Sequence, residues 1–240
     1  MKKNNMIASL FLLLISATGF IQPLAAEQRL VVGAKVLGAG WGGDNANGST
    51  FNSDNGGQLG LNIAYQLGKF YTGLNLQGGN YDFTGTAPSQ FTGSGSVSVG
   101  SDRIRQTEID LLVGYYIWPQ ISLFVDIKAV ENKWQSNNYK QNFGGLGLGI
   151  TGFNPLNKNW TLFGSLGFVT GDIEDGGKNR VGDGSSSALE VGVVYTLSKN
   201  NHLNFGFKFR SYDFKSNNGE QQNYDINALF VGYSHAFQLN

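Results

Sequence analysis

Residues 187–210 read SALEVGVVYTLSKNNHLNFGFKFR, and this stretch decides the fold. It contains two runs in which every second residue is apolar; the apolar positions are Leu189, Val191, Val193, Tyr195 and Leu197, then Leu203, Phe205, Phe207 and Phe209. The positions between them are mostly polar, charged or glycine, so each run has one apolar and one polar face, as β-strands do. The short polar link between the runs predicts a β-hairpin.

The alternation has two opposite readings. In a soluble sheet the apolar face would look into a core and the charged face into water. In a membrane barrel the apolar face meets lipid and the polar face lines the lumen. The pattern of this hairpin fits both readings, so the rest of the chain has to decide between them.

The N-terminus predicts export. Lys2 and Lys3 precede an apolar run over residues 7–21, and the small residue Ala26 follows soon after, which is the layout of a cleaved signal peptide. The alternative, a membrane anchor helix, needs about 20 apolar residues. We therefore expect residues 1–26 to be a signal peptide and the mature protein, residues 27–240, to form one barrel domain. No later run is apolar enough to predict an α-helical membrane protein.

Composition excludes several classes of protein. The chain has no Cys, which excludes disulfides, thiolate metal sites and a lipid-modified N-terminal Cys. Of the 17 basic residues, Lys2 and Lys3 lie in the signal peptide, which leaves 15 against 17 acids and gives no electrostatic case for a nucleic-acid partner. The chain holds 35 Gly and only 4 Pro, and the glycines lie inside the alternating runs, which indicates closely packed strands.

The alternation recurs along the whole mature chain and predicts about ten strands, with eight or twelve as alternatives. The further strands are expected over residues 29–37, 58–67, 70–77, 108–117, 121–128, 144–152, 160–170 and 224–237. Their connections differ in length. Short turns are expected near residues 68–69, 118–120, 154–159 and 198–201, and five long polar loops over residues 38–57, 82–103, 132–142, 171–186 and 214–223.

This asymmetry favours the membrane barrel, because outer-membrane barrels have short turns at one end and long loops at the other. Trp118 and Trp160 fall near the short turns, while Trp41 and Trp134 fall near the long loops, which predicts two aromatic girdles. With the signal peptide and the near-terminal sequence GYSHAF (residues 232–237), the chain resembles the bacterial outer-membrane β-barrel superfamily. Members typically end on the aromatic residue itself, whereas three residues follow it here.

The resemblance implies an all-β, up-and-down antiparallel transmembrane barrel in the outer membrane of a Gram-negative bacterium. Both termini would be periplasmic and the long loops would lie outside. The partners it implies are outer-membrane lipids, lipopolysaccharide and, during insertion, the barrel-assembly machinery.

Eight charged side chains share the lumen-facing parity: Lys35, Glu108, Asp110, Asp126, Lys128, Glu190, Lys208 and Arg210. One interpretation is a charged constriction in a small pore, or a catalytic carboxylate pair at Glu108 and Asp110. The other is a cross-strand ion network that fills a narrow barrel, since charges removed from water stay ionised only when paired. We favour the network, and expect Glu190 to lie across from Lys208 and Arg210.

Histidine argues against an enzyme. His202 and His235 are the two in the chain, and both are expected beside short turns, at the periplasmic end. Hydrolases that resemble omptins or lipid A deacylases place a His near the outer rim, so a His-based general base is not expected. Ser234 and His235 are adjacent in a strand and point to opposite faces. We predict no catalytic residues, no metal site and no cofactor.

Five cations are expected at the outer rim, where they could pair with lipopolysaccharide phosphates or be solvated loop charges: Arg103, Arg105, Lys133, Lys140 and Arg180. The sequence therefore predicts a small outer-membrane barrel with a surface-interaction or envelope-structural role through its outer loops, whose ligand it does not identify. The alternative is a narrow channel for ions or small solutes.

Overall fold

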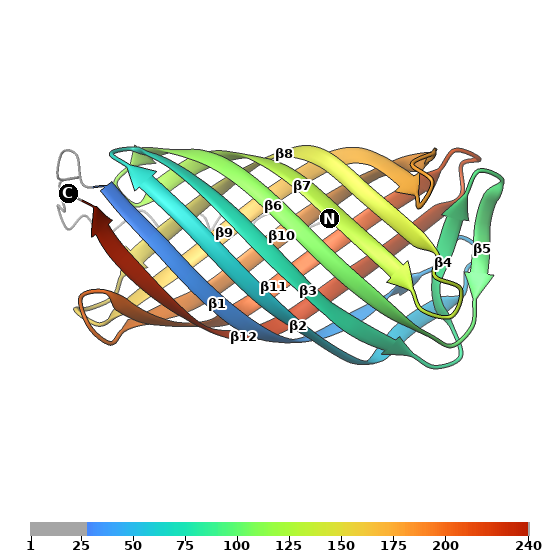
Figure 1. Ribbon diagram of the computed structural model, residues 1–240, viewed down its shortest axis with the longest axis horizontal. Coiled ribbons are helices and arrows are strands. Elements are labelled where there is room, and N and C mark those ends of the chain that lie inside the picture. The colour runs from blue at the N-terminus through green and yellow to red at the C-terminus, as the bar shows by residue number, and fades with distance from the viewer. Residues whose placement is uncertain (1–27, 240) are drawn as a thin grey trace, which may run out of the picture.

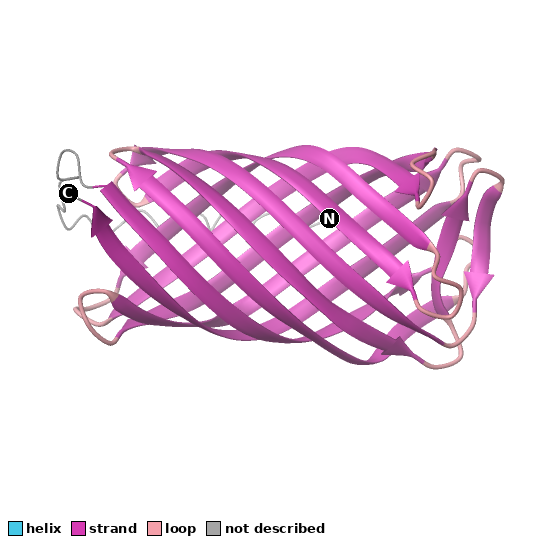
Figure 2. Cartoon of the chain, in the orientation of Figure 1, coloured by secondary structure: helices cyan, strands magenta, loops and turns pink. Residues whose placement is uncertain are grey.

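The computed structural model describes residues 28–239, and every regular element in that range is a β-strand (Figure 2). The barrel strands are β1 (Gln28–Asp44), β2 (Thr50–Leu67), β3 (Phe70–Phe83), β6 (Asp102–Trp118), β7 (Ile121–Trp134), β8 (Lys140–Pro155), β9 (Trp160–Asp175), β10 (Arg180–Thr196), β11 (Asn201–Ser216) and β12 (Gln221–Leu239). Two short strands, β4 (Ala87–Thr92) and β5 (Gly95–Val99), form a separate hairpin. The predicted signal peptide lies outside the described residues. Within residues 28–239 no helix is long and apolar enough to cross a membrane.

The ten long strands close into one barrel (Figure 1). Each strand pairs antiparallel with its neighbours, and β1 pairs with β12 along its whole length, from Gln28 opposite Leu239 to Asp44 opposite Asn223. The chain skips from β3 to β6 because the β4–β5 hairpin lies in the connection between them. We call the end where β1 begins and β12 ends the terminal end, and the opposite end the hairpin end. The predicted all-β antiparallel barrel of ten strands is confirmed.

The alternating apolar side chains of the barrel strands face outward. Val36, Leu59 and Leu148 are 62%, 67% and 69% exposed, although each lies in the middle part of its strand. A soluble protein would bury such residues, whereas a band of apolar side chains around the outside is the surface that a transmembrane barrel presents to lipid.

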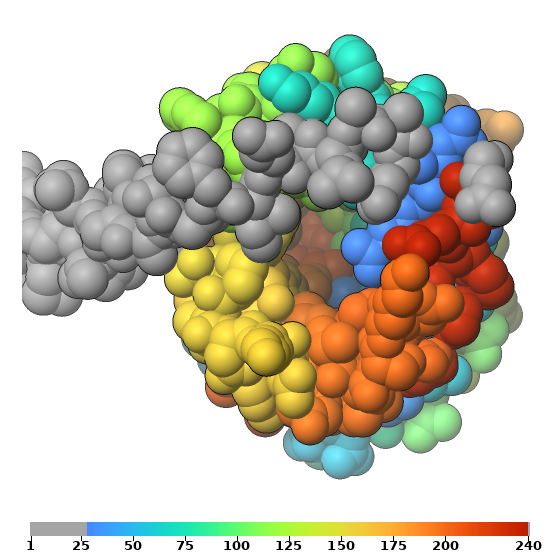
Figure 3. Space-filling model, turned by 90° about the vertical axis from the view of Figure 1, so that its left-hand side faces the viewer, coloured from blue at the N-terminus to red at the C-terminus, as the bar shows by residue number. Residues whose placement is uncertain are grey.

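Inside the terminal half, bulky side chains lie over glycines of the neighbouring strand. A Cβ added to Gly192 would come within 2.9 Å of the Phe163 ring, and one added to Gly206 within 2.7 Å of the Phe230 ring. Gly192 and Gly206 are themselves cross-strand partners. The rings therefore lie over these glycines, and Figure 3 shows a hollow at the terminal end.

Four of the five long loops that the sequence predicted are absent from the structure of residues 28–239. The strands run through these polar stretches and are joined by turns over residues 45–49, 135–139, 176–179 and 217–220. Only the connection over residues 84–101 is long, and it contains the β4–β5 hairpin. The barrel strands have 14 to 19 residues, whereas about 9–11 suffice to cross a bilayer. Their hairpin-end parts have a polar outer face, so the alternation that marks a strand fades there.

The prediction of a second aromatic girdle, near the long loops, is also wrong. Trp41 and Trp134 are 2% and 1% exposed and lie inside the barrel. Because β1 and β7 continue into the predicted loops, the inward parity of these strands includes both residues. At the terminal end Trp118 is 61% exposed and Trp160 is also exposed, so these two remain on the outer surface.

Candidate functional site

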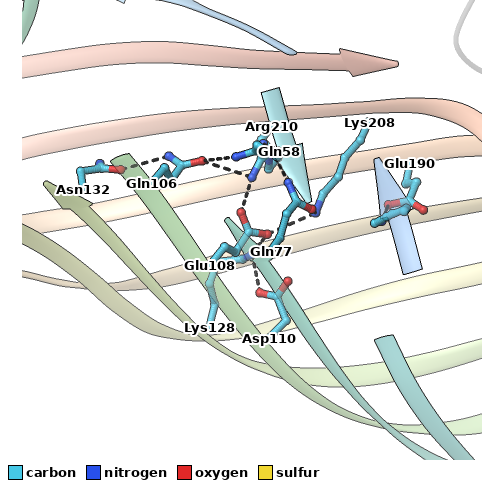
Figure 4. Close-up of polar contacts among 11 residues, drawn as sticks. Gln58, Gln77, Gln106, Glu108, Asp110, Lys128, Asn132, Glu190, Lys208 and Arg210 are labelled. Carbon is cyan, nitrogen blue, oxygen red and sulfur yellow. Dashed lines mark hydrogen bonds and ion pairs between the residues drawn. The ribbon is translucent and has the colours of Figure 1, made fainter. Parts of the chain in front are cut away.

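A cluster of buried ion pairs in the lumen is centred on one carboxylate, that of Glu108. Glu108 on β6 accepts bonds from Lys128 Nζ on β7 at 2.9 Å and from Lys208 Nζ on β11 at 3.2 Å, and its other oxygen contacts the guanidinium of Arg210 on β11 (Figure 4). In the strand order of the closed barrel, β6 and β11 lie five strands apart in either direction, so they face each other across the diameter. Ion pairs between them therefore cross the whole lumen. We call this group the ionic layer.

Amide side chains complete the ionic layer. Arg210 Nη2 donates to Gln58 Oε1 at 2.9 Å, Lys208 Nζ donates to Gln77 at 3.3 Å, and Gln106 Nε2 donates to Asn132 Oδ1 at 3.1 Å. These amides come from β2, β3, β6 and β7, so the bonded network joins four adjacent strands of the barrel wall to β11 (Figure 4). All four amide side chains are buried. Buried charges are stable when they are paired and their remaining bonds are filled in this way.

The structure divides the eight predicted lumen charges into three groups. Lys128, Lys208, Arg210, Glu108 and Asp110 form one cluster, in which Asp110 accepts a bond from Lys128. Lys35 and Glu190 form a separate pair at 3.2 Å. Asp126 is buried, and its Oδ1 has no hydrogen-bond partner among residues 28–239.

Glu190 lies across from Lys208 in the strand register, as predicted, but its ion pair is with Lys35. Lys208 instead extends over the lumen to Glu108, and Figure 4 shows Glu190 apart from the ionic layer. The short turn sets the register of Glu190 and Lys208. The ion-pair partner of Lys208 depends instead on the carboxylate that lies on the opposite wall of the barrel.

An aromatic core fills the lumen on the hairpin side of the ionic layer. The Trp41 ring lies 5.0 Å from Tyr224 and 5.2 Å from Tyr81, and Tyr212 stacks on Tyr224 at 4.8 Å. Further members of the same cluster are Phe51, Phe83, Ile104, Val130, Trp134, Phe143, Val169, Ile173, Val181, Phe214 and Ile226. The sequence did not predict this core. Several of its residues, such as Trp41, Phe51 and Trp134, fall in stretches assigned to loops, while Val169, Tyr224 and Ile226 lie in predicted strands on the inward parity. The signal that could have found them is the continuing inward parity of each strand.

Strand β4 closes the hairpin end. Its residues Ala87 and Phe91 are fully buried in the aromatic core. Side chains of the barrel strands on opposite sides hold the backbone of β4 by hydrogen bonds. On one side, Trp134 Nε1 donates to Pro88 O at 3.0 Å, and Phe91 N donates to Gln141 Oε1 at 3.0 Å. On the other side, Ser89 N donates to Asn45 Oδ1 at 2.7 Å. Figure 1 shows this hairpin over the end of the barrel.

Both histidines lie at the terminal end, as predicted. His202 Nδ1 is 3.3 Å from Thr196 Oγ1, and His235 Nδ1 is 2.8 Å from Asn201 Oδ1. Neither approaches the ionic layer, so the cluster around Glu108 holds no imidazole.

The hairpin-end parts of the barrel form a polar collar that carries the five predicted rim cations. Three of these cations have acid partners: Arg103 contacts Asp82, Lys140 contacts Glu131 at 2.8 Å, and Arg180 contacts Asp172 at 2.8 Å and also Asp183. The bond from Arg103 lowers the pKa of the Asp82 carboxyl. Arg105 and Lys133 lie directly opposite each other on β6 and β7, and no acid within ion-pair distance is found for them among residues 28–239.

A solved structure with a similar fold is an outer-membrane protein. The outer membrane protease OmpT from Escherichia coli matches with a TM-score of 0.56 at 12% identity, over 92% of this chain and 100% of that one. Neisserial surface protein A matches with a TM-score of 0.38 at 10% identity, over 87% of this chain and 97% of that one, a likeness too low to carry an argument. No family model and no curated protein matches the sequence. At 12% identity the likeness to OmpT shows the fold alone: the chain is a closed antiparallel β-barrel with the fold of an outer-membrane barrel.

Proposed function

We propose that this protein is a closed barrel of a Gram-negative outer membrane that acts through its outer surface, in surface interaction or envelope structure, and does not conduct solutes. The observation that carries the proposal is the contact of Lys208 and Arg210 with Glu108, since these ion pairs join opposite walls of the lumen. A continuous water path past them would have to break buried ion pairs, and leaving one partner unpaired costs about 3–5 kcal/mol.

The exposed apolar band supports the membrane location, because it would aggregate in water. The architecture shared with OmpT of Escherichia coli supports the outer membrane in particular. The collar then extends outside, where its side chains and the turns that join its strands form the contact surface.

The same arrangement supports a role without catalysis. OmpT is a protease, but a likeness at 12% identity shows a shared fold and not a shared chemistry. Here the two histidines lie at the terminal end, and the carboxylates Glu108 and Asp110 are already engaged by buried cations. A general base has to be free to accept a proton from a substrate.

The rival function is a narrow channel, and the hollow of the terminal half favours it (Figure 3). Planar-bilayer recording distinguishes the two. We expect correctly inserted protein to give no stepwise conductance, because the ionic layer, the aromatic core and β4 block the lumen in series. Insertion is checked independently by protease protection and by heat-modifiable migration.

Stepwise currents from inserted protein would reject the closed barrel. The variant Glu190→Gln provides a matched check on any current. It leaves Lys35 without its partner at the edge of the hollow, so a real pore would shift its selectivity toward anions, whereas leakage around the protein would not change.

A further inference from the structure

Two amide side chains line the hollow of the terminal half, next to the ionic layer (Figure 3). Asn75 on β3 is the next inward residue on the terminal side of Gln77, the amide that binds Lys208. Asn62 on β2 is the register partner of Asn75. Both amides are partly exposed although they point into the barrel, so their exposed surface faces the hollow. No hydrogen bond joins either side chain to another residue of the range 28–239, which leaves both amides free for a ligand.

A carboxylate and a hydroxyl face these amides from the opposite wall. Glu190 on β10 and Ser165 on β9 are register partners, and Glu190 is also the partner of Lys208, so both lie beside the ionic layer. In the closed strand order β10 lies five strands from β3 in either direction, and β9 lies five strands from β2. Glu190 holds one bond, from Lys35 at 3.2 Å, and Ser165 holds none within the described residues 28–239. Polar groups with unused bonding capacity therefore converge from both walls.

The walls between these polar groups are made of aromatic rings and glycines. A Cβ added to Gly149 would overlap the Phe124 ring, and one added to Gly167 would touch the same ring. Phe163 lies over Gly192 in the same way. Both rings are inward and partly exposed, so they add apolar surface to the hollow. A concave, largely apolar site with a few convergent polar groups is the usual form of a small-molecule site.

The charges around the hollow favour a neutral ligand. Glu190 is paired with Lys35, and the three buried acids next to the hollow are matched by three buried cations. A charged ligand would bring a charge that has no counterpart, which is costly away from bulk water. The free groups are amides and a hydroxyl, which both donate and accept, and carboxylate oxygens, which accept. They fit a ligand that carries several hydroxyl groups.

We propose that the hollow binds a neutral saccharide, which enters from the terminal end. Hydroxyl groups of the sugar donate to the Glu190 carboxylate and exchange hydrogen bonds with Asn75 and Ser165. The C–H face of the sugar ring packs on Phe124 or Phe163. The ionic layer is then the floor of a binding site as well as the block in the lumen. This site lies at the opposite end of the barrel from the contact surface of the proposed function and does not depend on it.

The test uses the full mature barrel in a zwitterionic detergent that carries no sugar headgroup. Isothermal titration calorimetry measures the binding of glucose, galactose, N-acetylglucosamine and a disaccharide of each, and we expect saturable binding of at least one. Asn75→Leu keeps the size of the side chain but removes its amide, and it should weaken this binding about tenfold, because its hydrogen bonds to the sugar are lost. The matched control is Asn80→Leu, the same change at an exposed outward position of β3, which should keep the wild-type affinity. The uronic acid and the amino sugar that correspond to the bound hexose should bind more weakly than the neutral sugar.

Thiol labelling gives a second measurement that does not require Asn75→Leu to fold. The chain has no Cys, so Ser165→Cys places a single thiol in the hollow. We expect a water-soluble thiol reagent to label it, and the bound sugar to slow the labelling. Failure of every sugar to bind, equal affinity of Asn75→Leu and the wild type, equal binding of the charged sugars, or a thiol that the sugar does not protect would each overturn the inference. None of these outcomes would affect the closed barrel, which is tested separately by bilayer recording.

Discussion

At the scale of single residues, the energetics of the lumen depend on Glu108. Its side chain is about 1% exposed and is shared by Lys128, Lys208 and Arg210. Removing four charged groups from water is costly, and the cost is offset because each charge has an ion-pair partner. Amide oxygens accept further bonds from Lys208 and Arg210, while Arg210 Nε has no hydrogen-bond partner among residues 28–239. Asp110 and Asp126 bring the buried acids to three, equal to the three cations, so the middle of the barrel is electrically neutral.

Replacing Glu108 by Gln should therefore be the most damaging conservative change in the lumen. Three buried cations would lose their shared carboxylate, and we expect the free energy of unfolding to fall by about 3–5 kcal/mol. Urea unfolding in lipid vesicles measures this change. The control is Glu190→Gln, whose Lys35 pair is partly open to the hollow, with side chains 18% and 24% exposed, and which should lose clearly less. Equal losses in the two variants would contradict the central role of Glu108.

At the scale of the strands, glycine decides where the bulky side chains go. Neighbouring inward positions combine a large residue on one strand with Gly on the next, as in Phe163 beside Gly192 and Phe230 beside Gly206. This arrangement packs the rings against backbone and lets adjacent strands approach closely. It explains why the chain has many glycines within its strands and few prolines.

Gly192→Ala should destabilise the barrel. The added Cβ would overlap the carbonyl oxygen of Phe205 and press on the Phe163 ring, and such overpacking costs about 1–3 kcal/mol. Gly38→Ala is the matched control, since nothing lies within 4 Å of its added Cβ on β1. Its stability should be unchanged or higher by up to about 1 kcal/mol, as expected for Gly→Ala in an unstrained position. Both are measured by urea unfolding, and a Gly192→Ala barrel as stable as Gly38→Ala would reject the packing argument.

At the scale of the whole molecule, the barrel has two unlike halves. Eight strands give an interior that side chains just fill, so ten strands leave extra space that something has to occupy. In the hairpin half this space holds the aromatic core, and β4 covers it. In the terminal half, rings lying over glycines leave the hollow (Figure 3). In the proposed function the closed half carries the outward surface, and the open half lies on the side of the termini.

The intact protein should behave as a membrane barrel. We expect it to require detergent for extraction, to migrate faster before boiling than after in gel electrophoresis, and to give a β-rich circular dichroism spectrum. These properties follow from an apolar outer band and a sheet without free edges. Release in soluble form without detergent would contradict the membrane assignment.

The sequence by itself predicted about ten strands, their antiparallel order, the short turns and the faces of the side chains within the predicted strands, because a period of two is a local property that the backbone imposes on every strand. It also placed the eight charges on the lumen side. It did not show that β1 continues past Gly38 or that Trp41 is inside, because the outer face becomes polar there and the alternation fades. The tertiary structure decided the partners. Glu108 meets Arg210, and Glu190 meets Lys35, because closure brings distant strands to opposite walls, and this juxtaposition is not encoded in spacing along the chain.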